Sequence, residues 1–336
     1  METSILRIGV IGCGTISRNV HLPVLLAIPG IKLAWVADTN QLSGYALSRA
    51  SGIPFHRISS SKIDLPFADI VVLAVPNGAR DSYYNYFASN REAGLYVEKP
   101  FAKSIAEHTR IVNGRAPWQV AVGLDRRSFG LTRLLRELFL HRPFGKPLSI
   151  KIELGGLGRV LIGGSFMSNS SLAGGGALYQ MGVHFLDAVV FASCAQDVEL
   201  RTGRMITADG MDIHVEGQLD LVLGPAERLP LAILVTQLQV ANNCIEIAFE
   251  GASVTFSIMY GERCLQVTPR NPGSSRWKLV PEATTGPLDM FASFGLHWTS
   301  VIQAFRTRTE NYTSASQALL TSKAMELLYS IPAEGD

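Results

Sequence analysis

The chain has 336 residues, of which 47% are hydrophobic and 17% are charged, and its formal net charge is +2. A chain of this length exceeds the usual size of one domain and predicts two. The low charged fraction excludes an intrinsically disordered chain. No run of lysine or arginine occurs, so nucleic acid is a poor candidate partner.

The four cysteines lie far apart in the sequence, at Cys13, Cys194, Cys244 and Cys264. None belongs to a C-x-x-C pair or to a cluster with histidine, so the sequence predicts neither a zinc site nor a disulfide framework. A reducing, cytoplasmic compartment is the expectation that follows. Residues 1–7 include an acid and lack a long apolar run, and we therefore expect no signal peptide.

The first third of the chain alternates continuous apolar runs with segments of helical composition. The apolar runs predict strands at residues 7–11, 32–37, 70–75, 95–97 and 118–122, with helices between them at 43–51, 79–93 and 104–112. Strands that are apolar along their whole length are buried on both faces, as in a parallel sheet covered by helices. Right-handed crossovers then predict a doubly wound Rossmann sheet in residues 1–122.

A glycine-rich turn follows the first predicted strand. Residues 12–17 read G-x-G-x-x-S, in which Gly12 permits a tight turn and Gly14 lets a pyrophosphate approach the backbone. Ser17 replaces the third glycine of the dinucleotide fingerprint and is small enough to be tolerated there. The alternative is a tight turn without a ligand. The residues expected to contact the dinucleotide at this turn are Gly12, Cys13, Gly14, Thr15 and Ile16.

Asp38 lies at the end of the second predicted strand. A carboxylate at this point accepts hydrogen bonds from the ribose hydroxyls and repels a 2′-phosphate, so the sequence favours NAD, with NADP as the alternative. Thr39 and Asn40 follow, and no arginine is adjacent to hold a phosphate.

A second apolar stretch, residues 172–196, has the length of a membrane span. His184 and Asp187 lie near its middle, and ionisable groups are costly in lipid. We therefore expect a buried helix of a soluble protein, and no membrane among the partners.

Three landmarks occur together in this chain: the glycine turn at 12–17, Glu-Lys-Pro at 98–100, and GGGALYQMGVHFLD at 174–187. Together they resemble the Gfo/Idh/MocA family, named for glucose–fructose oxidoreductase, inositol dehydrogenase and a rhizopine-catabolism protein. The resemblance extends over essentially the whole chain. Further matches lie at residues 75–77, 93–97, 144–147 and 298–331.

The resemblance implies a Rossmann domain, residues 1–122, followed by an α/β domain, residues 123–336, with a large, mostly antiparallel open sheet. The pattern after Gly145 agrees with such a sheet. In the family the open face often packs against another subunit, so a homodimer or homotetramer is expected. The strands predicted here are 148–154, 213–223, 231–240, 244–249 and 253–258.

The resemblance also implies chemistry, namely hydride exchange between nicotinamide and a sugar or cyclitol hydroxyl or ketone. Such a reaction moves a proton on oxygen and needs a group that titrates beside it. His184 is the candidate acid/base, and a buried core histidine is the alternative. Lys99 is the second candidate, which would stabilise a developing alkoxide, and a surface lysine paired with Glu98 is the alternative. The bond to Pro100 is often cis in the family. The other residues expected to line the cofactor are Ala74, Pro76, Asn77, Glu98 and Lys99.

Gln180 departs from the family pattern D-x-x-x-H, in which an aspartate lies one helical turn before the histidine. Glutamine can orient a substrate, but it holds no negative charge. Either Lys99 and His184 carry out the chemistry alone, or the substrate lies outside simple polyol oxidation.

Four further residues are candidates for binding substrate. Asp187 is expected to orient the imidazole or to cap a neighbouring element, and Tyr179 to donate a proton or to pack in the core. Arg126 or Arg127 is expected to bind a phosphate or carboxylate, with a salt-bridge role as the alternative. Arg159, in the glycine-rich segment 155–164, is a fifth candidate.

Loop closure over the pocket is expected from residues 155–164 and 165–171. The predicted function is an NAD(P)-dependent dehydrogenase or ketoreductase acting on a modified or nucleotide-linked sugar or a cyclitol in a biosynthetic pathway. The alternatives are a non-catalytic sensor or regulator, and an oxidoreductase of imines or dihydrodiols.

Overall fold

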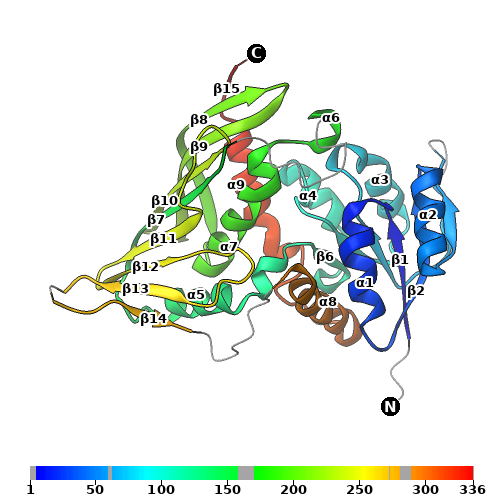
Figure 1. The fold of residues 1–336 in the computed structure, drawn as a ribbon, viewed down its shortest axis with the longest axis horizontal. Helices are drawn as coiled ribbons and strands as arrows, with labels where there is room; N and C mark the ends of the chain where they lie inside the picture. The colour runs from blue at the N-terminus through cyan, green and yellow to red at the C-terminus, as the bar shows by residue number, and fades with distance from the viewer. Residues whose placement is uncertain (1–4, 60–62, 158–169, 272, 281–288, 336) are drawn as a thin grey trace.

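The computed structural model describes residues 5–59, 63–157, 170–271, 273–280 and 289–335. Its strands form a six-stranded sheet in the N-terminal part and a nine-stranded sheet in the C-terminal part. Figure 1 shows the two sheets in separate lobes, with the helices α7 (Val183–Ser193) and α9 (Leu319–Tyr329) between them. The predicted α/β fold class is confirmed.

The N-terminal sheet has the strand order β3-β2-β1-β4-β5-β6, and all its neighbouring strands are parallel. This is the doubly wound order, in which the winding reverses between β1 (Leu6–Ile11) and β4 (Ile70–Leu73). The remaining elements are β2 (Ile31–Asp38), β3 (Phe55–Arg57), β5 (Gly94–Val97), β6 (Val120–Val122), α2 (Gln41–Ser51), α3 (Asp81–Ser89) and α4 (Ile105–Val112).

Two details of this sheet differ from expectation. Strand β3 was not predicted, because its three residues are partly or fully exposed and form no apolar run. The strand expected over 118–122 is shorter, because residues Pro117–Gln119 form a 3-10 turn that begins at the proline.

The helical segment after the glycine turn widens at its centre. Residues Ser17–His21 form a π-turn, η1, which continues into α1 (Leu22–Leu26). Pro23 has no N–H to donate back along the helix, and its ring crowds the preceding turn, which explains why the segment widens just before it. His21, the last residue of the π-turn, is fully buried.

The C-terminal sheet has the order β14-β13-β12-β11-β7-β10-β9-β8-β15. The pairs β7/β10 and β8/β15 are parallel and the other neighbours are antiparallel, as expected of a mostly antiparallel sheet. Its strands are β7 (Pro147–Gly155), β8 (Asp197–Ala208), β9 (Met211–Gly224), β10 (Glu227–Thr236), β11 (Cys244–Phe249), β12 (Ala252–Phe256), β13 (Leu265–Pro269), β14 (Trp277–Leu279) and β15 (Ala333–Glu334).

Strand β8 was missed because most of its side chains are exposed or half-buried, and its polar/apolar alternation does not continue beyond Arg201. The strand expected over 231–240 instead begins at Glu227 and ends at Thr236. In Figure 1 the helices α5 (Gly130–His141), α7 and α9 lie on the inner side of this sheet, and the described helices leave its outer side uncovered.

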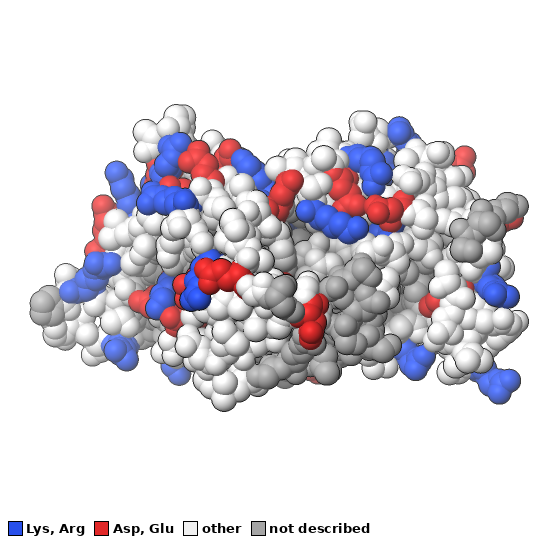
Figure 2. Space-filling view, turned by 90° about the horizontal axis from the view of Figure 1, so that it is seen from above, with Lys and Arg blue, Asp and Glu red and all other residues white. Residues whose placement is uncertain are grey.

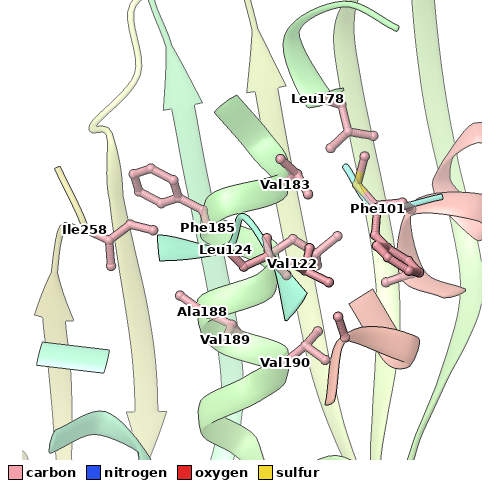
Figure 3. Close-up of a cluster of buried hydrophobic side chains, with 14 of the residues drawn as sticks. Phe101, Val122, Leu124, Leu178, Val183, Phe185, Ala188, Val189, Val190 and Ile258 are labelled. Atoms are coloured by element: carbon pink, nitrogen blue, oxygen red, sulfur yellow. The ribbon is translucent and has the colours of Figure 1, made fainter. Parts of the chain in front are cut away.

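The apolar stretch 172–196 contains a π-turn, η6 (Leu178–Gly182), followed directly by α7. Nearly every residue of α7 is buried, and Figure 3 shows its apolar side chains pointing in several directions, with Phe185 toward Ile258 and Val183 on the opposite side. A helix enclosed on all sides is apolar all round, which explains its resemblance to a membrane span. In the described part of the chain, no helix is both long and apolar enough to cross a bilayer.

Helix α8 (Met290–Thr307) returns to the N-terminal lobe, beside α1. Its residues Phe294, Trp298 and Val301 share one hydrophobic cluster with Val20 and Leu25. We therefore propose that the cofactor domain, predicted to end at residue 122, is completed by α8 from the C-terminal part of the chain.

Charged side chains of both signs are interspersed over the face that Figure 2 shows, without a large patch of one sign. This agrees with the formal net charge of +2.

The buried His108 joins the two lobes through α4. Its ring nitrogens lie 2.8 Å from the hydroxyl of Ser322 and 3.0 Å from the carbonyl oxygen of Ala315, and burial lowers its pKa to about 4. Between about pH 6.5 and pH 4, His108 is protonated in the unfolded chain but stays neutral in the folded chain. Stability therefore falls as the pH drops from about 6.5 toward 4, and we expect His108 alone to cost about 2 kcal/mol at pH 5.

The measurement is urea unfolding at pH 7 and pH 5. We expect His108→Gln to reduce the loss of unfolding free energy between these pH values, and His141→Gln, at a highly exposed site, to leave it unchanged. An equal loss in wild type and His108→Gln would contradict the assignment.

Candidate active site

The glycine turn lies at the carboxyl ends of β1 and β4, where doubly wound sheets bind ligands. Gly12 has φ +98°, and a Cβ there would lie 2.3 Å from the carbonyl oxygen of Ala74, so only glycine fits. A Cβ on Gly14 would meet no atom within 4 Å. The backbone at Gly14 is therefore open to the close approach that a pyrophosphate requires, and the turn fits a dinucleotide.

Asp38, at the end of β2, is held against this turn. Its two carboxylate oxygens accept hydrogen bonds from the backbone N–H groups of Cys13, at 2.6 Å, and Asn40, at 2.7 Å. These bonds hold the carboxylate beside the crevice, where ribose hydroxyls are expected. Burial, with the negative charge of Asp38, raises the pKa of the Cys13 thiol to about 12, so this cysteine is not a nucleophile at neutral pH.

Glu98, at the end of β5, is held by a chain of hydrogen bonds from three elements. The indole N–H of Trp298 in α8 donates to Nδ1 of His21, at 3.1 Å, so the other ring nitrogen, Nε2, carries the proton that it shares with Glu98 at 3.0 Å. Burial acts to raise the pKa of Glu98. The hydrogen bond from His21 and the positive charge of Lys99 outweigh it, and the pKa lies below its ordinary value.

Lys99 follows directly, and the Lys99–Pro100 peptide bond is cis, as the family resemblance implies. The guanidinium of Arg80 donates to the carbonyl oxygen of Pro100, at 2.5 Å, and anchors this loop. The ammonium of Lys99 donates to the main-chain oxygen of Gln180, at 2.8 Å. Burial lowers the pKa of Lys99, while Glu98 and Asp125 oppose that shift.

His184 lies in the first turn of α7 and is buried. Burial, with the positive charges of Lys99 and Arg126, holds the pKa of His184 well below its ordinary value, so the imidazole is neutral near pH 7. Its Nδ1 lies 3.8 Å from Oδ1 of Asp125. The structure thus brings Lys99 and His184 into one buried cluster.

Gln180 contacts this cluster through its main chain rather than its side chain, since its carbonyl oxygen accepts from Lys99. It lies in the π-turn η6, whereas His184 lies in α7. The expected role of its side chain in orienting substrate stays a prediction.

Arg126 borders the cluster and is buried. Its Nη1 donates to Asp125, at 2.5 Å, and to the hydroxyl of Tyr260, at 2.6 Å, and its guanidinium lies 4.0 Å from the centre of the Tyr260 ring. An arginine held in this way presents a fixed charge beside Lys99 and His184, and it stays a candidate for binding a substrate anion.

Arg127 and Asp187 bond to each other instead of to a substrate. Both are buried, and the guanidinium donates to the carboxylate at 2.6 and 2.9 Å. Arg127 also donates to the carbonyl oxygens of Tyr312 and Gln317, and Asp187 accepts from Thr321. These contacts disagree with the substrate contacts expected of both residues and with an orienting role of Asp187 toward His184. Neighbours in sequence, Arg126 and Arg127 point to different partners.

Tyr179 lies in the interface between the lobes. Its hydroxyl accepts a hydrogen bond from Asn77, at 2.7 Å, its ring packs edge-on against Tyr329, and burial raises its pKa to about 12. A proton is released from such a group only at high pH, so these contacts favour the packing alternative for Tyr179. Asn77, expected at the cofactor, uses its amide group in this bond.

The sequence analysis did not identify Asp212, which organises the glycines before α7. Its buried carboxylate accepts from the backbone N–H groups of Gly176, at 2.5 Å, and Leu178, at 2.7 Å. The alternation in β9 places Asp212 among the polar positions of the strand, so no sequence pattern indicated its buried role. The candidates Arg159 and residues 158–169 of the two proposed closing loops lie outside the described residues.

The architecture defines the class: a Rossmann domain with a dinucleotide crevice, joined to a second α/β domain with a large open sheet. The model of the oxidoreductase family with an NAD-binding Rossmann fold, GFO_IDH_MocA, matches residues 6–122. Residues 6–122 thus carry the sequence pattern of the Gfo/Idh/MocA oxidoreductases.

Comparison with individual proteins agrees with the family. A protein of Amycolatopsis mediterranei, provisionally named as the oxidoreductase subunit of a UDP-kanosamine synthase, is 29% identical over 192 residues. The match covers 55% of this chain and 51% of that relative, so it spans about half the relative's length.

Solved structures share the fold over nearly the whole chain. The 3-ketoreductase KijD10 of Actinomadura kijaniata, in complex with NADP and TDP-benzene, has a TM-score of 0.79, 13% identity and 99% coverage of both chains. The WlbA dehydrogenase of Bordetella pertussis, in complex with NADH and UDP-GlcNAcA, has a TM-score of 0.77, 19% identity and coverage of 98% of this chain and 96% of that one.

Proposed function

We propose that the chain is an NAD-dependent dehydrogenase or ketoreductase that acts on a secondary hydroxyl or ketone of a sugar, in particular a nucleotide-linked sugar, in a biosynthetic pathway. The observation that carries the proposal is the convergence of Lys99 and His184, from two different lobes, in one buried cluster. The Glu-Lys-Pro segment lies at the carboxyl end of β5, along the same edge of the sheet as the glycine turn.

When bound, the nicotinamide exchanges a hydride with the carbon that carries the oxygen. In the oxidation direction that carbon loses a hydride, and the oxygen loses a proton to the chain. His184, neutral near pH 7, accepts the proton at a ring nitrogen, and Lys99 stabilises the negative charge that develops on the oxygen. In the reduction direction His184 returns the proton.

The substrate class is supported by the proteins that share this fold. KijD10 is described as a 3-ketoreductase and was crystallised with TDP-benzene, and WlbA was crystallised with UDP-GlcNAcA. The similar protein of Amycolatopsis mediterranei is named for a UDP-linked aminosugar. Free sugars and cyclitols remain within the proposal as the alternative substrates.

The test measures absorbance at 340 nm with NAD or NADH and a panel of UDP-glucose, UDP-N-acetylglucosamine, TDP-glucose, free glucose, myo-inositol, a cyclic imine and a dihydrodiol. We expect turnover with a nucleotide-linked sugar. Turnover only with imines or dihydrodiols would replace the proposed substrate class. Tight NADH binding without hydride transfer to any compound would instead favour the non-catalytic sensor.

Asp38 is the basis for the proposed preference for NAD. We expect NADH to bind at least about 10-fold more tightly than NADPH, because the carboxylate repels a 2′-phosphate. Asp38→Asn keeps an oxygen for one backbone N–H and removes the charge, and we expect it to narrow this preference. NADH fluorescence titrations measure both dissociation constants. A wild-type preference for NADPH would contradict the assignment.

We also infer that the protein forms a homodimer or homotetramer through the large sheet. Support comes from the outer side of that sheet, which no described helix covers in Figure 1. Analytical ultracentrifugation tests this inference, and a monomer at micromolar concentration would contradict it.

A further inference from the structure

The acid/base histidine of this protein lacks a carboxylate one helical turn before it, since Gln180 occupies that position. A different carboxylate lies close to the imidazole. Asp125, in the 3-10 turn η4 (Asp125–Ser128) after β6, is fully buried, and its Oδ1 is 3.8 Å from Nδ1 of His184. Both of these atoms are buried, and neither has a hydrogen-bond partner among the described residues.

The other oxygen of Asp125 is fully occupied. Oδ2 accepts from Arg126, at 2.5 Å, from the hydroxyl of Ser293, at 2.6 Å, and from Tyr260, at 3.3 Å. The carboxylate is therefore clamped at one oxygen, while the other faces the imidazole. A buried polar atom without a hydrogen-bond partner lowers the stability of the folded state. A small movement that shortens the distance between Oδ1 of Asp125 and Nδ1 of His184 would let these two atoms form a hydrogen bond with each other. In the absence of substrate, the donor–acceptor distances of catalytic hydrogen bonds are often longer than in the complex.

We propose that Asp125 is the positioning residue of His184 and replaces the carboxylate that position 180 lacks. The inference rests on the proposed acid/base role of His184. Asp125 accepts a hydrogen bond from Nδ1–H, which leaves the lone pair of Nε2 free to take the proton of the substrate hydroxyl. It then stabilises the imidazolium that forms. Other charged or titratable groups close to this pair include Lys99, Tyr96, Arg126, Tyr260 and His297.

The test is Asp125→Asn in the full-length protein. The amide oxygen must face the three donors that clamp Oδ2, so the amide N–H₂ turns toward His184 and donates to Nδ1. The proton is then forced onto Nε2, and the base is lost. We expect kcat for hydride transfer to fall about 10²-fold or more, with NADH binding unchanged. The limb of the pH profile due to His184 should shift to lower pH, because the imidazolium loses its carboxylate.

A readout independent of turnover is the tautomer of His184, observed by ¹⁵N NMR and assigned by comparison with His184→Gln. We expect Nδ1–H in the wild type and Nε2–H in Asp125→Asn. Asp220→Asn is the matched control, since Asp220 is also buried and bonded to an arginine, Arg201 in β8. We expect it to change neither the tautomer nor the pH profile.

Two results would overturn the inference: an Nε2–H tautomer in the wild type, or an Asp125→Asn protein with unchanged tautomer and pH profile. A double-mutant cycle gives a third test. If Asp125→Asn lowered kcat as much in the His184→Gln background as in the wild type, the inference would also be contradicted, because a residue that acts through His184 has no further effect once His184 is replaced. Failure of this inference can be distinguished from failure of the proposed function, because the tautomer of His184 is measured without a substrate.

Discussion

We expect Lys99→Ala to abolish hydride transfer, with a loss of at least about 10³-fold in kcat, because in the proposed mechanism it removes a positive charge beside the reacting oxygen. The Lys99 side chain is half-buried and its ammonium is held by the carbonyl oxygen of Gln180, so its position does not depend on a bound substrate. Single-turnover and steady-state measurements at 340 nm quantify the loss. NADH fluorescence shows whether the cofactor still binds, and we expect only a small change there.

Two variants make this result specific. Lys99→Met keeps the aliphatic stem and removes only the charge, and we expect the same loss as in Lys99→Ala. Lys103→Ala removes a nearby lysine whose ammonium is half-exposed and lies 3.8 Å from Asp81, and we expect activity close to the wild type. If Lys99→Met retained more than a tenth of the wild-type kcat, the catalytic role of Lys99 would be wrong.

Arg127→Leu has the largest expected effect on stability. It leaves the carboxylate of Asp187 buried without its cation, and the carbonyl oxygens of Tyr312 and Gln317 lose their donor. Removal of one partner of a buried ion pair costs about 3–5 kcal/mol, because the remaining charge stays uncompensated. Urea unfolding measures the change, and we expect the midpoint to shift without new intermediates.

The controls separate a structural role from substrate binding. Arg133→Leu removes an exposed arginine of the adjacent helix α5, and we expect a change in stability of less than about 1 kcal/mol. The double variant Arg127→Leu/Asp187→Leu should recover part of the lost stability, since it leaves no unpaired charge. A raised KM with unchanged unfolding would show that Arg127 binds substrate after all.

The arrangement of the N-terminal sheet could be predicted because the burial pattern of each strand is visible in the residues of that strand alone. A strand apolar along its whole length, such as β4, has few places to lie other than the centre of a covered parallel sheet. The turn at Gly12 was predictable for the same reason, since a positive φ and a close approach to Ala74 both require glycine. Strand β3 could not be found, because a short strand at a sheet edge has no apolar pattern.

Site partners could not be predicted in this way, because each is joined by contacts across long sequence separations. His21 meets Glu98 and Trp298 only after three segments of the chain have packed together. The adjacent Arg126 and Arg127 have the same chemistry in the sequence. Their difference arises because one side chain meets Asp125 and Tyr260, and the other meets Asp187.

The amino-acid sequence by itself determined the Rossmann topology, the glycine turn, the acid at the end of β2, and the presence of Lys99 and His184 in recognisable motifs. Only the tertiary structure decided that Asp125 faces His184, that α8 completes the N-terminal lobe, and that Asp187 belongs to a buried ion pair. The physical reason is that backbone conformation and burial pattern follow from neighbouring residues. The partner of a buried charge instead depends on which distant segments share its volume and on which donors and acceptors remain unsatisfied there.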